Sequence, residues 1–205
     1  MRKGLLIALF WASIALASPL VISKPTVFLK DTFLATSFKI QHLLGQQETK
    51  TIQSGFTVTI KIDVELWKKG RLFHDLETTR QITKEISYDI WEKIYTLRFD
   101  KGDILKFDNL TDLKETLSQE DIVLIRPLKE LEGKKVYFVQ IRVDMESINK
   151  KEMEEIAKRI NGDSPAFINL QKIFAVLVRH RSKDIKSYIQ SDNFKPDTLK
   201  GISND

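Results

Sequence analysis

Alternation of apolar and polar residues predicts β-strands through most of the first 145 residues. The clearest case runs from Phe56 to Leu66, where every second residue is apolar and the residues between are polar or charged. Because successive side chains of a strand point to opposite faces, this strand would cover one side of a core and show its other side to water. Similar patterns predict strands at residues 26–30, 33–40, 76–88, 93–100, 104–107, 122–128 and 134–145.

Turns and two short helices separate these strands. Gly70 and Gly102 lie in short polar turns, while a helix at residues 43–53 would end at Gly55 and another at 109–117 would begin at an Asn109 cap. In the strand predicted at 76–88, polar and apolar residues share the same row. This indicates that part of the strand is an edge or an exposed flank of the sheet. Strands at hairpin spacing favour a mainly β (α+β) fold, an antiparallel β-sandwich that is immunoglobulin-like in general architecture.

The pattern becomes helical after Asn149. Apolar residues recur at helical spacing in 149–160 and 165–179, a last helical stretch is expected near 182–191, and a polar tail follows. We therefore divide the chain into a signal peptide (1–17), a β-sandwich domain (18–160) and a C-terminal helical segment with a polar tail (161–205). The helices would either cover an open face of the sheet or dock at one end.

The first seventeen residues have the three parts of a secretory signal. Arg2 and Lys3 precede an apolar run at 5–16, and Ala15 and Ala17 stand where signal peptidase accepts small residues. An uncleaved anchor is the alternative, but the twelve residues of that run would reach about 18 Å as a helix, short of the ~30 Å hydrocarbon core. We expect cleavage near Ala17 and a periplasmic or secreted protein.

Composition narrows the chemistry that the chain can perform. It has no cysteine, which excludes disulfides, thiol catalysis and thiolate metal sites, and His42, His74 and His180 lie far apart in the sequence. The net charge of +5 is a mildly basic balance rather than a nucleic-acid footprint. Neither a glycine-rich phosphate loop nor a Gly-x-Ser-x-Gly pattern occurs. We expect no enzymatic activity, cofactor, metal or nucleic-acid partner.

Tyr88, Asp89, Trp91 and Tyr95 form the most distinctive short pattern in the chain. Trp and Tyr offer rigid contact area with a polar tip, which suits a partner-binding surface. The alternative, which we favour, is a structural corner in which a tyrosine hydroxyl and the aspartate carboxylate hold a turn between two strands.

A second candidate contact lies in the helical stretch 165–179. Six consecutive apolar residues at 173–178 precede a basic run, a combination typical of helices that lie on anionic membranes. The residues that would contact a membrane or groove are Ile173, Phe174, Leu177 and Val178. We prefer the alternative that the helix covers the sheet, because Asn169 and Lys172 shorten the apolar span.

The order of several of these features is that of a known family. The Ser54-Gly55-Phe56 step leads into the long alternating strand, and the Ile86-Ser87-Tyr88-Asp89 corner, Tyr95, a Leu-rich helix at 109–117 and a strand carrying residues 137–143 follow. Over residues 26–160 the chain resembles an uncharacterised family of exported bacterial proteins, domain of unknown function family 4390. The resemblance implies an extracytoplasmic sandwich-like domain and transfers no activity or catalytic residue.

These features together predict a non-enzymatic exported protein of the cell envelope. It would bind an envelope protein, or another envelope component, through a sheet edge or the aromatic corner. The first alternative is a peripheral membrane or lipid-associated protein held by the C-terminal amphipathic helix. The second is a hydrolase whose site is assembled from residues scattered along the sequence.

Overall fold

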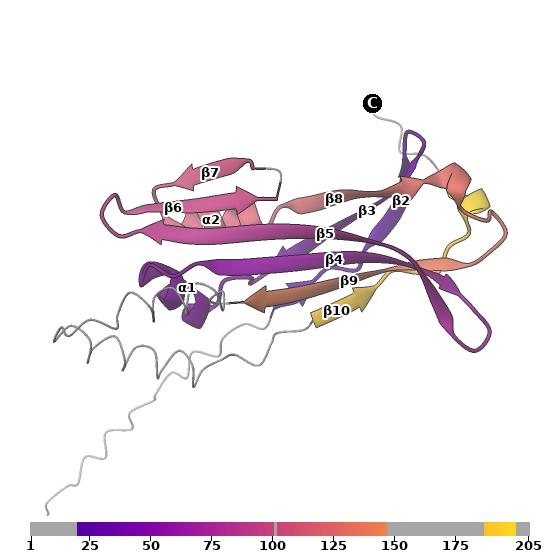
Figure 1. The fold of residues 1–205 in the computed structure, drawn as a ribbon, viewed down its shortest axis with the longest axis horizontal. Coiled ribbons are helices and arrows are strands. Elements are labelled where there is room, and N and C mark those ends of the chain that lie inside the picture. The colour runs from indigo at the N-terminus through magenta and orange to yellow at the C-terminus, as the bar shows by residue number, and fades with distance from the viewer. Residues whose placement is uncertain (1–19, 101, 147–186, 200–205) are drawn as a thin grey trace, which may run out of the picture.

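The computed structural model describes residues 20–100, 102–146 and 187–199. The described segments form strands and short helices, which are labelled in Figure 1. They are β1 (Val21–Ile22), β2 (Thr26–Lys30), β3 (Phe33–Gln41), α1 (Gln46–Gln53), β4 (Val58–Lys69), β5 (His74–Asp89), β6 (Ile94–Phe99), β7 (Ile104–Phe107), α2 (Leu110–Leu117), β8 (Glu120–Pro127), η1 (Leu128–Glu130), β9 (Tyr137–Glu146), β10 (Ser187–Gln190) and η2 (Pro196–Thr198). The chain is therefore mainly β, as its alternation predicts.

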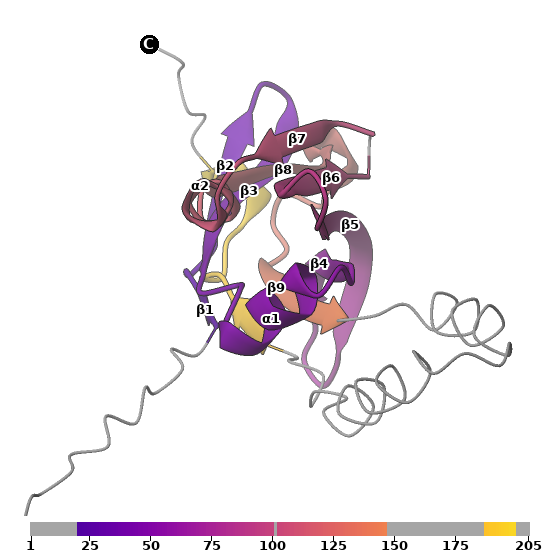
Figure 2. The ribbon, with the colours of Figure 1, turned by 90° about the vertical axis from the view of Figure 1, so that its left-hand side faces the viewer.

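Two antiparallel sheets face each other in a sandwich-like arrangement (Figures 1 and 2). The larger sheet has the strand order β10-β9-β4-β5-β6-β7. In the smaller sheet β2 and β8 pair with the same part of β3, so they lie on its two edges, and β1 pairs with the far end of β3. Neither α1 nor α2, nor any other helix in the described part, is long and apolar enough to cross a bilayer.

The core lies between the two sheets. β4 is the central strand of the larger sheet, and its whole apolar row from Val58 to Leu66 is buried. The neighbouring row of β9, from Val139 to Val143, and Phe38 of β3 in the opposite sheet belong to the same cluster. The alternation of β4 thus buries one face, while its polar face carries side-chain hydrogen bonds described below.

The helices and turns largely follow their sequence signals. Asn109 caps α2 by accepting a hydrogen bond from the backbone N–H of Asp112, as predicted. Gly55 ends α1 with φ of +85°, a left-handed conformation that glycine adopts without steric cost. α1 begins at Gln46 rather than near Leu43, because Leu43 and Leu44 lie in the core ahead of the helix.

β5 is exposed along part of its length, as its mixed facing predicts. His74 to Ile86 of β5 pair with β4, whereas only Lys84 to Asp89 pair with β6. Residues 74–83 therefore form an edge of the larger sheet.

Residues 187–199 differ from the prediction. Ser187–Gln190 form the strand β10, where the sequence predicts a helix, because they pair with Gln140 to Val143 of β9. Phe194, in the predicted polar tail, exchanges two backbone hydrogen bonds with Tyr137 and stacks on its ring at 6.1 Å. Ser187–Gln190 and Phe194 thus pair with β9 of the larger sheet. The predicted signal at 1–17 and helices at 149–160 and 165–179 lie outside the described residues.

Candidate functional site

The aromatic corner lies where β5 turns into β6, at the left-hand end of the molecule in Figure 1. Asp89 Oδ1 accepts hydrogen bonds from the backbone N–H groups of Trp91 and Glu92, at 2.8 and 2.9 Å. Lys93 completes the turn with φ of +59°. This is an Asx turn, in which the aspartate side chain fixes the backbone of the residues that follow it.

The two tyrosines brace the same corner from the inside of the sheet. Their ring centroids lie 4.5 Å apart, and Tyr95 is buried. The hydroxyl of Tyr95 accepts a hydrogen bond from Gln53 Nε2 of α1 at 2.9 Å. Tyr88, Asp89 and Tyr95 therefore have the contacts of a structural corner, which is the alternative favoured from the sequence.

Trp91 differs from the other three residues of the set. Trp91 is 93% exposed, and the neighbouring Ile90 is 53% exposed. Ile90 nevertheless lies over the α1–β4 turn, because a Cβ placed on Gly55 would come within 3.1 Å of its Cδ1. The corner thus presents an indole from a backbone that Asp89 holds in place. Its role in partner binding stays a prediction.

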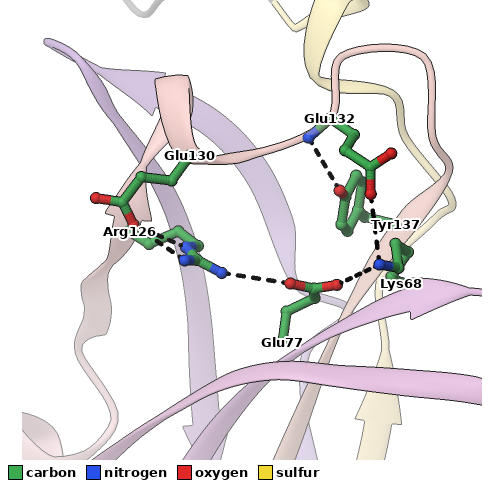
Figure 3. Close-up of polar contacts among 6 residues, drawn as sticks. All are labelled: Lys68, Glu77, Arg126, Glu130, Glu132 and Tyr137. Carbon is green, nitrogen blue, oxygen red and sulfur yellow. Dashed lines mark hydrogen bonds and ion pairs between the residues drawn. The ribbon is translucent and has the colours of Figure 1, made fainter.

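A charged cluster that the sequence does not reveal joins the two sheets at the opposite end (Figure 3). Glu77 lies between Lys68 and Arg126, with its carboxylate oxygens 2.9 and 3.4 Å from their nitrogens. Arg126 also pairs with Glu130 at 3.0 Å, and Lys68 reaches Glu132 at 3.5 Å. Because Lys68 and Glu77 belong to the larger sheet and Arg126 to β8, the cluster connects the two sheets across their open end.

The electrostatics of this cluster favour a structural role. The hydrogen bond to Glu77, followed by the charges of Glu77 and Glu132, raises the pKa of Lys68 above its usual 10.5. A lysine acts as a general base or nucleophile at neutral pH only when its pKa is lowered. Lys68 therefore remains a cation here, and its contacts clamp the sheets together.

A second connection between the sheets is buried. Lys84, on the inner row of β5, donates to both carboxylate oxygens of Asp121 on β8, at 2.9 and 2.8 Å. Arg80 of β5 donates from Nε to the backbone carbonyl of Ile125 at 2.8 Å. β5 and β8 are thus joined along their length by polar contacts rather than by a hydrogen-bonded ladder.

The polar face of β4 carries a network shared with β9, which Gln190 of β10 extends by donating from Nε2 to Gln140 Oε1 at 2.9 Å. Arg142 pairs with Asp63 and Glu65, both at 2.9 Å, and the hydrogen bond to Asp63 raises the pKa of Arg142. The other oxygen of Glu65 accepts from Trp67 Nε1 at 3.0 Å and from Gln140 Nε2 at 3.1 Å. The buried carboxylate of Glu65 is therefore fully hydrogen-bonded, as a structural group requires.

Comparison with known families gives one match. The family described as domain of unknown function DUF4390 matches residues 17–149. The chain belongs to this family. The match confirms the resemblance predicted from the sequence, and it spans β1 to β9 together with the corner and the charged cluster. No curated protein and no solved structure matches the chain significantly.

The histidines do not come together in the part of this DUF4390 chain that the structure describes. His42 is exposed, and His74 meets the ring of Phe138 edge-on at 5.3 Å. Residues 20–100, 102–146 and 187–199 contain no group of three or more His, Cys, Asp or Glu side chains arranged to hold a metal. His180, and the candidate contact Ile173, Phe174, Leu177 and Val178, lie outside the described residues.

Sequence reasoning missed an exposed apolar pair at the β4–β5 turn. Leu72 and Phe73 are 85% and 82% exposed. Their position in the sequence could have indicated this exposure. The two large apolar residues directly follow the turn residues Gly70 and Arg71 and belong to the apolar row of neither flanking strand.

Proposed function

We propose that this chain is a non-enzymatic, exported binding module of the cell envelope that holds a protein partner at the aromatic corner. The proposal includes removal of residues 1–17 on export. It also includes an immunoglobulin-like arrangement of the two sheets and the helices expected at 149–160 and 165–179. The observation that carries it is the near-complete exposure of Trp91 on a turn fixed by Asp89.

An exposed tryptophan on an ordered turn is well suited to binding a protein partner. Tryptophan is enriched among the few residues that dominate protein–protein binding energies, because its large rigid surface loses little conformational entropy on contact. Holding Trp91 on an ordered turn lowers the ordering cost of binding further. Ile90 beside it would add apolar area to the same contact.

The test is co-purification of the full chain with its partner from envelope extracts. We compare the natural chain with Trp91→Ala and with a matched control, Tyr188→Ala, which removes another exposed aromatic ring from the β10 edge. We expect a stoichiometric partner with the natural chain and the control, and at least about tenfold weaker binding with Trp91→Ala. Recovery of the chain only as a free monomer, or equal binding by both variants, would contradict the proposal.

Trp91→Ala is a clean substitution for this purpose. Since the indole is exposed, its removal should leave the free energy of unfolding unchanged within about 0.5 kcal/mol. A loss of partner binding with unchanged unfolding would then report on the contact itself.

A further inference from the structure

The tip of the β4–β5 hairpin, residues 69–74, projects from the end of the molecule opposite the aromatic corner. Figure 1 shows it extending past the other strands at the lower right. Leu72 and Phe73 are consecutive residues of this tip, and both are almost fully exposed. Single exposed apolar residues are common on soluble proteins, but an adjacent pair at the end of a projection indicates a contact surface.

The hairpin is held rigidly at its base. Phe138 of β9 stacks on Trp67 at 6.4 Å and meets His74 edge-on, so an aromatic cluster joins both strands of the hairpin to β9. Lys69 donates a backbone hydrogen bond to the carbonyl of Val136. Gly70 has no room for a side chain, because a Cβ there would overlap the carbonyl oxygen of Phe73. The turn thus presents its apolar pair without further ordering.

The charges around the tip are mainly positive. Lys69 and Arg71 are exposed, and neither side chain makes an ion pair or hydrogen bond with the described residues. Lys134 and Lys135 are exposed on the loop that ends at Val136, next to Lys69. Asp75 is the acidic residue nearest the tip on the hairpin, and Glu132 of the neighbouring loop is paired with Lys68.

We propose that the hairpin tip inserts into the surface of an anionic phospholipid bilayer. Leu72 and Phe73 enter below the headgroups, while Lys69 and Arg71 stay at the level of the lipid phosphates. Apolar side chains flanked by basic ones bind such surfaces through buried apolar area together with attraction to anionic lipid. Lys134 and Lys135 add to that attraction from the neighbouring loop.

The shape of the tip favours a bilayer over a protein partner. A specific protein interface buries about 800 Å² on each side, and a convex turn of six residues (69–74) cannot supply this area by itself. A fluid bilayer needs no matching hollow, because its lipids move aside for a wedge. This contact is independent of the aromatic corner and uses residues other than the helical segment predicted at 165–179.

The test places an environment-sensitive fluorophore at the tip of the full chain. The chain has no natural cysteine, so Leu72→Cys labels one position cleanly, and Tyr188→Cys labels an exposed control position on β10. Each protein is mixed with vesicles of phosphatidylcholine alone or of phosphatidylcholine with phosphatidylglycerol. We expect a blue shift at position 72 with anionic vesicles only, and none at position 188. Because the fluorophore reports only on its own surroundings, vesicle binding through the apolar run at 5–16 would not by itself shift the emission at position 72.

Charge reversal tests the electrostatic part of the proposal. In the labelled Leu72→Cys chain, the added substitutions Lys69→Glu and Arg71→Glu should raise the lipid concentration needed for the shift on the order of tenfold. In the chain that keeps Lys69 and Arg71, added salt should weaken the shift. The proposal is overturned by no shift at position 72, by equal shifts at 72 and 188, or by equal shifts with neutral and anionic vesicles. A shift that grows with protein concentration without vesicles would assign the tip to self-association instead.

Discussion

The buried pair between Lys84 and Asp121 gives the sharpest test of how the two sheets are joined. The Lys84 side chain is 5% exposed and that of Asp121 is 20% exposed. Asp121→Asn keeps the shape of the side chain but leaves the buried ammonium without a counter-charge. Removing one partner of a buried ion pair costs about 3–5 kcal/mol, and we expect Asp121→Asn to fall in this range.

The reverse substitution should cost less. Lys84→Met keeps the length of the side chain and removes the buried charge, and its neighbours across the sheet are Ile60 and Phe99. Asp121 is left unpaired, but water reaches it more easily than it reaches Lys84. We expect Lys84→Met to cost about 1–2 kcal/mol, because the remaining carboxylate is only partly desolvated.

Urea unfolding of the two single variants and the double variant measures these costs. An unchanged denaturant slope would show that the unfolded states are comparable. The exposed pair Lys61–Glu146, also at 2.9 Å, is the matched control, and Glu146→Gln should cost less than about 1 kcal/mol. The reasoning is refuted if Asp121→Asn costs under about 1 kcal/mol, or if Lys84→Met costs as much as Asp121→Asn.

Two further predictions concern the ends of the sandwich. Gly55→Ala should destabilise the chain by more than Gly102→Ala in thermal unfolding. Both glycines have φ near +85°, so each alanine costs about 1 kcal/mol in backbone strain, but only the Cβ at Gly55 meets Ile90. Equal losses of stability would mean that the contact with Ile90 contributes nothing. Because the pKa of Lys68 is raised, its stabilising contribution is complete below pH 10.5 and is lost as the pH rises through the raised value. The difference in unfolding free energy between the natural chain and Lys68→Gln should therefore be constant at neutral pH and shrink above about pH 10.5, and a difference that grows there would contradict the assignment.

The alternation of the chain predicted most of the strands because the long strands bury one face. β4 is the clearest example, since its apolar row and its polar row are both uninterrupted. β10 escaped prediction because Ser187–Gln190 does not alternate apolar with polar residues, and its strand state depends on pairing with β9.

Polar partners were harder to predict than strands. The sequence places Lys84 in the same row as Ile82 and Ile86, but it does not show that Asp121 meets it from the other sheet. The same holds for Glu77 and Arg126, which are 49 residues apart and meet because β5 and β8 come together. Alternation assigns a side chain to a face, whereas the packing of the two sheets decides its partner.

The central strand β4 lies between the two proposed contacts, the aromatic corner and the hairpin tip. β4 begins near the aromatic corner and ends at the hairpin tip, and its twelve residues span about 40 Å at the rise of an extended strand. Trp91 would therefore stand well beyond the headgroups of a bilayer that receives Leu72 and Phe73. Because the strand between them is paired on both sides, the two contacts can form at once without deforming the core. The same rigid strand would then fix the distance between a membrane surface and the partner held at the corner.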